Sequence, residues 1–244
     1  MPRREVFYAP AEQFQNLRIV LTGEEHRHLS RVLHHRVGER IIVVDGAGLA
    51  VDAEIVSLQR ERTELRVLKK MRRYGESFTQ ITLAAAVPKG SRFDWIVEKA
   101  TELGVVEIVP MHTERTETEA KAAKIARWQR LALAAMKQCC RSYCPTVRPL
   151  ATFAEVCRQS REFDVGLIAH EAGGDVLRSL MGALPPRKIL VCIGPEGGFT
   201  EDEIEAALAC GAQTLGLGPR RLRADTAALA AVAKILTRLG QMDS

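Results

Sequence analysis

The alternation of apolar runs and helical segments after residue 77 constrains the fold of this 244-residue chain more than any other feature. Runs such as ITLAAAV (81–87) and KILVCI (188–193) are apolar almost throughout, rather than at every second residue. Strands of that kind are buried on both faces, as in parallel sheets. Because helical stretches separate the runs, the pattern predicts an α/β region whose parallel sheet is covered by helices on both sides.

The individual elements of this region follow from the same pattern. Strands are expected at 81–87, 105–111, 164–170, 188–193 and 213–217. Helices are expected at 91–104, 119–139, 175–183, 200–210 and 226–239. Two pairs of residues, Ser91 with Asp94 and Thr200 with Glu203, have the spacing of capping boxes, so we expect helices to begin there.

The first seventy residues have a different pattern. Short strand-like runs separated by turn residues predict a meander, and in so short a segment a small β-barrel, with strands at 41–45, 50–58 and 63–70. Thr22 is expected to cap one short helix that ends near Gly38. After the meander, the stretch RRYGES (72–77) is polar and has no periodicity. We therefore divide the chain into a domain at 1–72, a linker at 73–77 and a domain at 78–244.

Positive charge is concentrated in the first part of the chain. The net charge is +5, and residues 1–75 hold 14 Lys and Arg against 10 Asp and Glu, which leaves one excess positive charge for the remainder. A basic module beside a neutral one favours a polyanionic partner, with RNA or DNA as the leading candidate. The alternative is an arginine-rich surface that only contacts solvent.

Other features narrow the class of protein. No run approaches 18 apolar residues, so a membrane span is not expected, and the N-terminal MPRREVFYAP lacks the features of a secretion signal. We expect a cytoplasmic protein without a membrane partner. The CCRSYC stretch (139–144) lacks metal-binding spacing, and no acid or cysteine completes a site in the histidine-rich HRHLSRVLHHR. No metal is expected.

Three strand ends carry unusual loops, LIAHEAGG, CIGPEGGFTEDE and LGLGPRRLRADT. Ligands of parallel sheets bind beyond the carboxyl ends of the strands, which is where these loops fall. The second loop has neither the lysine of a P-loop nor the spacing of a dinucleotide fingerprint. A phosphate at the following helix would be repelled by a group of acids, namely Glu196, Glu201, Asp202 and Glu203.

The glycines of the second loop still require an explanation. Gly194, Gly197 and Gly198 allow the backbone to turn sharply and to approach a ligand closely. A tight strand-to-helix turn without a ligand is the alternative. Because LGLGP supplies a second glycine-bearing strand end nearby, we favour a pocket for a neutral or cationic adenosine derivative such as S-adenosylmethionine.

Three stretches of the chain, in the same order, resemble one known family. VPKGSRFDWIVEKATELGVVEIVPMHTERT, IGPEGGFTEDEI and LGLGPRRLRADTAALAA are similar to the bacterial 16S rRNA (uridine-N3) methyltransferases, the RsmE family of the SPOUT class. The resemblance implies a PUA-like N-terminal barrel and a deep C-terminal trefoil knot that holds S-adenosylmethionine. It also implies a homodimer that methylates N3 of a uridine in 16S rRNA, within the assembled small ribosomal subunit. The chain departs from the family at Ala224-Asp225, where Thr-Glu is usual.

The resemblance also indicates site residues. The methyl donor is expected to contact Ala169, His170, Ile193, Gly194, Gly197, Gly198, Leu215, Leu217, Gly218, Leu222, Arg223 and Thr226. Removing the imide proton from uridine N3 requires stabilisation of the anion, and we expect the Arg223 guanidinium to provide it; a surface ion pair is the alternative. Glu171 or Asp225 is the candidate base, although Asp225 or Thr226 also suits the cap of the last helix.

RNA contacts are expected from both domains, through Arg3, Arg4, Arg31, Arg36, Lys89, Arg92 and Arg115. Such side chains supply affinity for phosphate without sequence information. Two other classes of protein fit the sequence less well. A nicotinamide-dependent oxidoreductase would need an early phosphate-binding loop, which the sequence lacks. A non-enzymatic RNA-binding protein would leave the two glycine-bearing loops unexplained.

Overall fold

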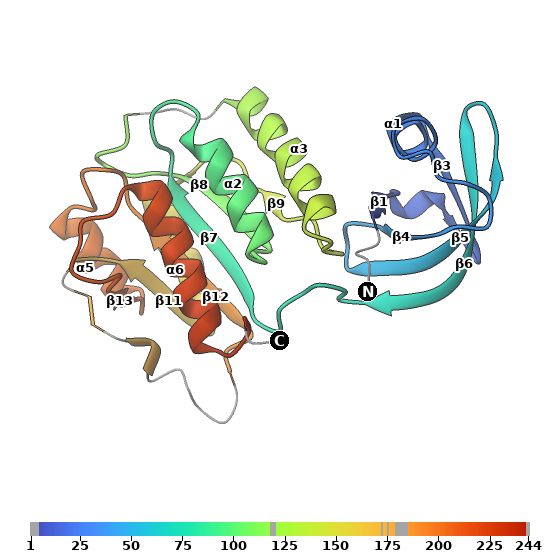
Figure 1. Ribbon diagram of the computed structural model, residues 1–244. Coiled ribbons are helices and arrows are strands. Elements are labelled where there is room, and N and C mark those ends of the chain that lie inside the picture. The colour runs from blue at the N-terminus through green and yellow to red at the C-terminus, as the bar shows by residue number, and fades with distance from the viewer. Residues whose placement is uncertain (1–4, 118–120, 172, 175, 179–184, 243–244) are drawn as a thin grey trace. The chain divides into compact units, whose positions relative to one another are not determined.

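The structure, a computed structural model, describes residues 5–117, 121–171, 173–174, 176–178 and 185–242. The chain forms two compact units. Unit 1 comprises Met1–Glu76 with Leu133–Cys144, and unit 2 comprises Ser77–Ala132 with Pro145–Ser244 (Figure 1).

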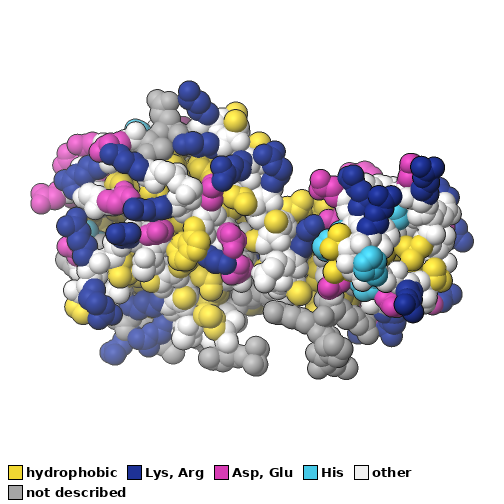
Figure 2. All heavy atoms as spheres, turned by 45° about the horizontal axis from the view of Figure 1, so that its top comes forward, with side chains coloured by type: hydrophobic (Ala, Val, Ile, Leu, Met, Phe, Trp, Pro, Cys, Tyr) yellow, Lys and Arg dark blue, Asp and Glu magenta, His cyan; other side chains and the backbone are white. Residues whose placement is uncertain are grey.

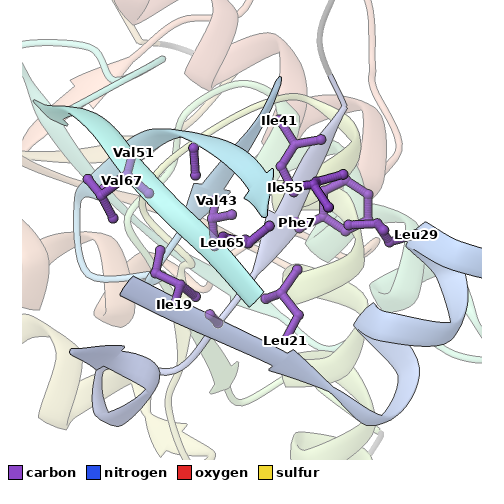
Figure 3. Packing of buried hydrophobic residues seen from close by; sticks show 12 residues of the cluster. Phe7, Ile19, Leu21, Leu29, Ile41, Val43, Val51, Ile55, Leu65 and Val67 are labelled. Carbon is purple, nitrogen blue, oxygen red and sulfur yellow. The ribbon is translucent and has the colours of Figure 1, made fainter. Parts of the chain in front are cut away.

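Unit 1 is built on a six-stranded sheet. Its strands are β1 (Val6–Tyr8), β2 (Phe14–Gln15), β3 (Arg18–Thr22), β4 (Arg40–Val44), β5 (Leu49–Leu58) and β6 (Arg62–Arg72). The hydrogen-bonded order is β1-β4-β5-β6-β3-β2, antiparallel except for β1 with β4. The sheet curls around an apolar cluster that includes Phe7, Leu21 and Leu65 (Figure 3). Strands β4 to β6 confirm the predicted meander, whereas β1 to β3 were not predicted.

One short helical segment interrupts this sheet. Thr22 occupies the N-cap position of α1 (Gly23–Arg27), as predicted, but its side chain makes no capping hydrogen bond. A π-helical turn, η2 (His28–Val32), follows directly, so the helical segment ends before the expected Gly38. The 3-10 turn η1 (Ala11–Gln13) lies earlier in the unit.

Unit 2 contains the predicted parallel sheet. Its strands are β7 (Gln80–Ala86), β8 (Glu107–His112), β9 (Thr146–Val147), β10 (Ala151–Thr152), β11 (Val165–Ala169), β12 (Lys188–Ile193) and β13 (Gln213–Leu215). The order is β10-β8-β7-β12-β11-β13, with β9 paired to β8, and every pair is parallel. The five predicted strands are confirmed, and the two-residue strands β9 and β10 are additional.

Helices lie on both faces of this sheet, as predicted (Figure 1). The helical elements are α2 (Arg92–Glu102), α3 (Ala122–Gln138), α4 (Phe153–Gln159), η3 (Ser160–Glu162), η4 (Val176–Arg178), α5 (Glu201–Ala209) and α6 (Ala224–Arg238). The part of α3 from Leu133 onward belongs to unit 1. Helix α6 packs on β7 and β12 with α2 beside it, whereas α4 and α5 cover an apolar cluster that includes Cys157 and Cys192. Much of the helix expected at 175–183 lies outside the described residues. Among the residues that the structure describes, no helix is long and apolar enough to cross a membrane.

Of three further capping predictions, one is confirmed in position only, one is wrong and one is fully confirmed. Ser91 occupies the N-cap of α2 as expected but makes no capping bond, and the Asp94 carboxylate instead accepts from Trp128 Nε1 (2.8 Å) and the Arg127 guanidinium. Helix α6 has Arg223 at its N-cap, so neither of the residues expected there caps it. The third prediction holds, since α5 begins with the expected reciprocal hydrogen bonds of a capping box.

Candidate functional site

The carboxyl ends of three adjacent parallel strands meet at one edge of the unit 2 sheet. They lead into the β11 loop (170–171 and 173–174), the β12 loop (194–200) and the β13 loop (216–223). These loops, with the start of α6, enclose a pocket of about 360 Å³. It is lined by Arg115, Ala169, His170, Glu171, Ile193, Gly194, Pro195, Glu196, Gly197, Gly198, Phe199, Leu217, Gly218, Arg220, Arg221, Leu222, Ala224 and Ala227.

The β11 and β13 loops are pressed against each other at two glycines. The Gly216 N–H donates to the Gly174 carbonyl (3.2 Å), and a Cβ atom added to Gly216 would lie 2.1 Å from the Gly173 carbonyl oxygen. From α6, Lys234 Nζ donates to the Gly216 carbonyl (2.7 Å). No side chain fits at this crossing, so glycine is required there.

The β12 loop is held by arginines on two sides. Arg115 Nη1 donates to the Gly197 carbonyl (2.6 Å) and, at 3.5 Å, to the Phe199 carbonyl. From the β13 loop, Arg221 Nη2 donates to the Glu196 carbonyl (3.2 Å). These bonds fix the backbone that forms one wall of the pocket.

The acids that follow this loop also have structural roles. Glu203 Oε2 accepts from the Thr200 N–H (2.9 Å), and Thr200 Oγ1 accepts from the Glu203 N–H (3.2 Å). The other oxygen of Glu203 accepts from the Glu114 N–H (2.9 Å), so one carboxylate joins the β12 loop to the loop after β8. The N-terminus of α5 is therefore occupied by its own side chains, consistent with the argument against a phosphate there.

The pocket gathers most of the residues expected to contact the methyl donor. Those on its lining are Ala169, His170, Ile193, Gly194, Gly197, Gly198, Leu217, Gly218 and Leu222. Leu215, Arg223 and Thr226 are not on the lining. Of the candidate catalytic groups, Glu171 lines the pocket, whereas Asp225 lies in the first turn of α6 and accepts from the Thr226 N–H (2.9 Å).

Sequence reasoning missed several lining residues, namely Pro195, Glu196, Phe199, Arg220, Arg221, Ala224 and Ala227. All of them belong to the two later loops or to the start of α6. Extending the prediction from the glycines to the whole of each loop would have found them. The loop-bracing roles of Arg115 and Arg221 depend on tertiary contacts that no sequence pattern indicates.

The cations expected to contact RNA are in different surroundings. Lys89 forms an ion pair with Glu117, and Arg92 pairs with Glu196 (3.1 Å). Arg115 braces the β12 loop. Arg31 and Arg36 are exposed on unit 1, and the remaining two predicted contacts, Arg3 and Arg4, lie outside the described residues.

Comparison with known proteins shows the family of this chain. Residues 75–236 match the family model of an RNA methyltransferase domain, and residues 21–68 match that of an RNA methyltransferase PUA domain. The chain is 34% identical to ribosomal RNA small subunit methyltransferase E of Synechocystis sp., over 92% of this chain and 74% of that protein. The chain belongs to the ribosomal RNA small subunit methyltransferase E family.

Two other members of the small subunit methyltransferase E family are also similar to this chain. The Bacillus subtilis enzyme is 30% identical, with 88% of each chain covered. The crystal structure of the Neisseria gonorrhoeae enzyme, bound to S-adenosyl methionine, is 33% identical with a TM-score of 0.85, covering 96% of this chain and 98% of that one. The resemblance predicted from three sequence motifs is thus confirmed.

Proposed function

We propose that this chain is an S-adenosylmethionine-dependent methyltransferase that acts on N3 of a uridine in 16S rRNA. The observation that carries the proposal is the three-loop pocket in unit 2. The proposal is also supported by the chain's membership of the family and by the donor bound to the Neisseria gonorrhoeae relative. The uridine-N3 specificity follows from the motif resemblance.

The pocket suits this donor in size and chemistry. A volume of about 360 Å³ is at the small end of the range for small-molecule sites. Ile193, Leu217 and Leu222 offer apolar surface for an adenine ring, and the loop backbones offer donors and acceptors for ring nitrogens and hydroxyls. The Glu171 carboxylate would attract the sulfonium cation, while the lining also holds Arg115, Arg220 and Arg221, which suit the donor's own carboxylate. When bound, S-adenosylmethionine supplies an activated methyl group.

The protein's part of the chemistry is to remove a proton and to hold the uracil. Of the two candidate bases, Glu171 is the better placed, because its residue lines the pocket. Arg223 is exposed between the lining residues Leu222 and Ala224. There its guanidinium would stabilise negative charge on a uracil oxygen and so lower the pKa of the imide.

The finer features of the fold belong to the same proposal. We assign the crossing of the β11 and β13 loops to a deep trefoil knot, a threading that most folds avoid. The close contact between Gly173 and Gly216 supports this assignment. The curled sheet of unit 1 is proposed to be a PUA-like, RNA-binding barrel, with the division at 1–72, 73–77 and 78–244 retained.

We further propose a homodimer in the cytoplasm, acting on the assembled small subunit. Helix α6 is apolar around most of its circumference, with partly exposed Ala227, Leu229, Ala230 and Ala233. A helix of that kind normally packs against protein on all sides. Beside it, α2 carries Trp95, which is 44% exposed. A second copy of the chain would cover both.

Calorimetric titration separates this proposal from its rivals. We expect S-adenosylmethionine to bind the purified protein with one site per chain, and NADH to give no heat of binding. Tight binding of NADH in place of S-adenosylmethionine would favour an oxidoreductase. If neither ligand binds while RNA does, the chain is a non-enzymatic RNA-binding protein and the proposal fails.

A further inference from the structure

Residues 26–38 of unit 1, which we name the basic turn, contain three arginines and four histidines but no aspartate or glutamate. The segment includes the π-helical turn η2, and the residue two positions after it, His34, has a left-handed backbone with φ 55°. Non-glycine residues seldom adopt that conformation, and π-helical turns are frequent at functional sites. Figure 2 shows histidine side chains in cyan beside Lys or Arg side chains in dark blue on unit 1, with some acidic side chains in magenta among them.

The inner side of the basic turn is firmly anchored. Leu29 is fully buried in the unit 1 core, and His26 Nδ1 is 2.8 Å from Thr63 Oγ1. The His35 ring donates to the Glu39 carboxylate (2.5 Å), a hydrogen bond that holds the pKa of Glu39 below its usual value. The turn is thus fixed before any partner binds, which reduces the entropy cost of binding.

The outer side of the turn combines free positive charge with apolar surface. Arg31 and Arg36 are exposed, and among the described residues neither guanidinium forms an ion pair, although the Glu39 carboxylate accepts from the Arg36 backbone N–H. Between and beside them, Val32 is 63% exposed and Val37 is 59% exposed. Two valines with so much exposed surface, next to two unpaired guanidinium groups, form a surface with no evident role in folding.

The sheet of unit 1 presents arginines of a different kind. Arg40 pairs with Asp52, Arg66 with Glu54 (2.5 Å), and Arg62 with Glu64 (3.0 Å). A guanidinium held by a carboxylate has lost part of its attraction for an external anion. These three sheet arginines are already paired, whereas Arg31 and Arg36 on the basic turn form no ion pair among the described residues.

We propose that the basic turn binds unpaired nucleotides of the RNA substrate, an inference that rests on the proposed function. Arg31 and Arg36 contact two phosphates, and Val32 and Val37 contact the faces of unstacked bases. Phosphates call for cations, and only bases that have left a duplex expose an apolar face. The turn would therefore distinguish a single-stranded region of rRNA from a double helix.

The test measures the affinity of the full-length protein for a short unstructured RNA and for an RNA duplex of the same length, over a range of salt concentrations. We expect tighter binding to the unstructured RNA. The pair Arg31→Ala with Arg36→Ala should weaken that binding about tenfold and reduce the slope of log K against log salt by about 1.4. The pair Val32→Ser with Val37→Ser should weaken it about fivefold and leave duplex binding unchanged.

A matched control is the pair Arg62→Ala with Arg66→Ala on the sheet, which should change either affinity less than twofold. Equal losses from the sheet pair and the turn pair would overturn the proposal, as would full affinity for unstructured RNA in the valine variant. Turn variants that keep RNA affinity but fail to bind small subunits would instead indicate a protein partner. Donor titration of the same variants keeps the two proposals separate: binding of S-adenosylmethionine should be unchanged in all of them.

Discussion

Arginines line the pocket of unit 2 and form part of the basic turn of unit 1, but they differ in what they contact. At the pocket, Arg115 and Arg221 donate to backbone carbonyls of the β12 loop. On the basic turn, the guanidinium groups of Arg31 and Arg36 form no ion pair among the described residues. From the sequence, Arg31, Arg36 and Arg115 were all expected to contact RNA. The comparison teaches that the neighbours of a guanidinium decide whether it shapes the protein or remains available to a ligand.

The largest effect is expected where the pocket depends on backbone contact alone. Gly216→Ala places a methyl group against the Gly173 carbonyl, so we expect the free energy of unfolding to fall by about 3 kcal/mol or more. Chemical denaturation measures this loss. The control is Gly174→Ala, whose added Cβ would meet no atom within 4 Å and should be nearly neutral. Equal stability of the two variants would show that the loops do not cross as described.

A smaller effect is expected from a pocket arginine. Arg115→Ala removes the bonds to the Gly197 and Phe199 carbonyls, so affinity for S-adenosylmethionine should fall about tenfold. Affinity for unstructured RNA should change less than twofold, the reverse of the outcome expected for the basic turn. Arg130→Ala, an exposed position on α3, is the control. If Arg115→Ala weakened RNA binding and spared donor binding, the contrast between the two regions would be wrong.

The Glu203 carboxylate, which links two loops, should contribute about 1–2 kcal/mol to the free energy of unfolding. Glu203→Ala loses the capping bond to Thr200 and the bond to the Glu114 N–H, and urea unfolding would report the difference. Glu205→Ala, exposed on the same helix, should have little effect. Equal losses from both variants would indicate that general helix charge, rather than the link, stabilises this wall.

The smallest effect concerns pH and Asp164, the residue just before β11. Hydrogen bonds from the Lys188 and Arg187 N–H groups lower the pKa of Asp164 below its ordinary 3.8. Because the folded pKa is the lower one, this stabilisation is present above pH 3.8 and is lost as the pH falls through the folded pKa. Asp164→Asn should lower Tm by about 2 °C at neutral pH and converge with the wild type in strong acid. A constant difference at all pH values would contradict this assignment.

Much of the fold could be predicted from local pattern. KILVCI and similar runs indicated buried parallel strands because their apolar character is continuous. Helix α4 was missed although Thr152 and Glu155 form a capping box, a spacing present in the sequence. The capping box expected at Ser91 failed for a tertiary reason, since Trp128 and Arg127, distant in sequence, engage Asp94.

The pocket could be predicted only in part. Glycines at strand ends indicated the loops, and the parallel sheet brought those ends together. The contact of Gly173 with Gly216 joins segments far apart in sequence, so periodicity carries no signal of it. Arg223 and Asp225 were expected to be catalytic from the sequence. The lining of the pocket, however, includes Ala224 and neither of these two neighbours.

The most direct test of the account is transfer of a labelled methyl group from S-adenosylmethionine to small ribosomal subunits purified from a strain that lacks this protein. Digestion of the 16S rRNA to nucleosides and mass spectrometry identify the product. We predict one N3-methyluridine per subunit, greatly reduced with Gly216→Ala and retained with Gly174→Ala. A methyl group on another atom or base, or its absence with the wild-type protein, would contradict the account.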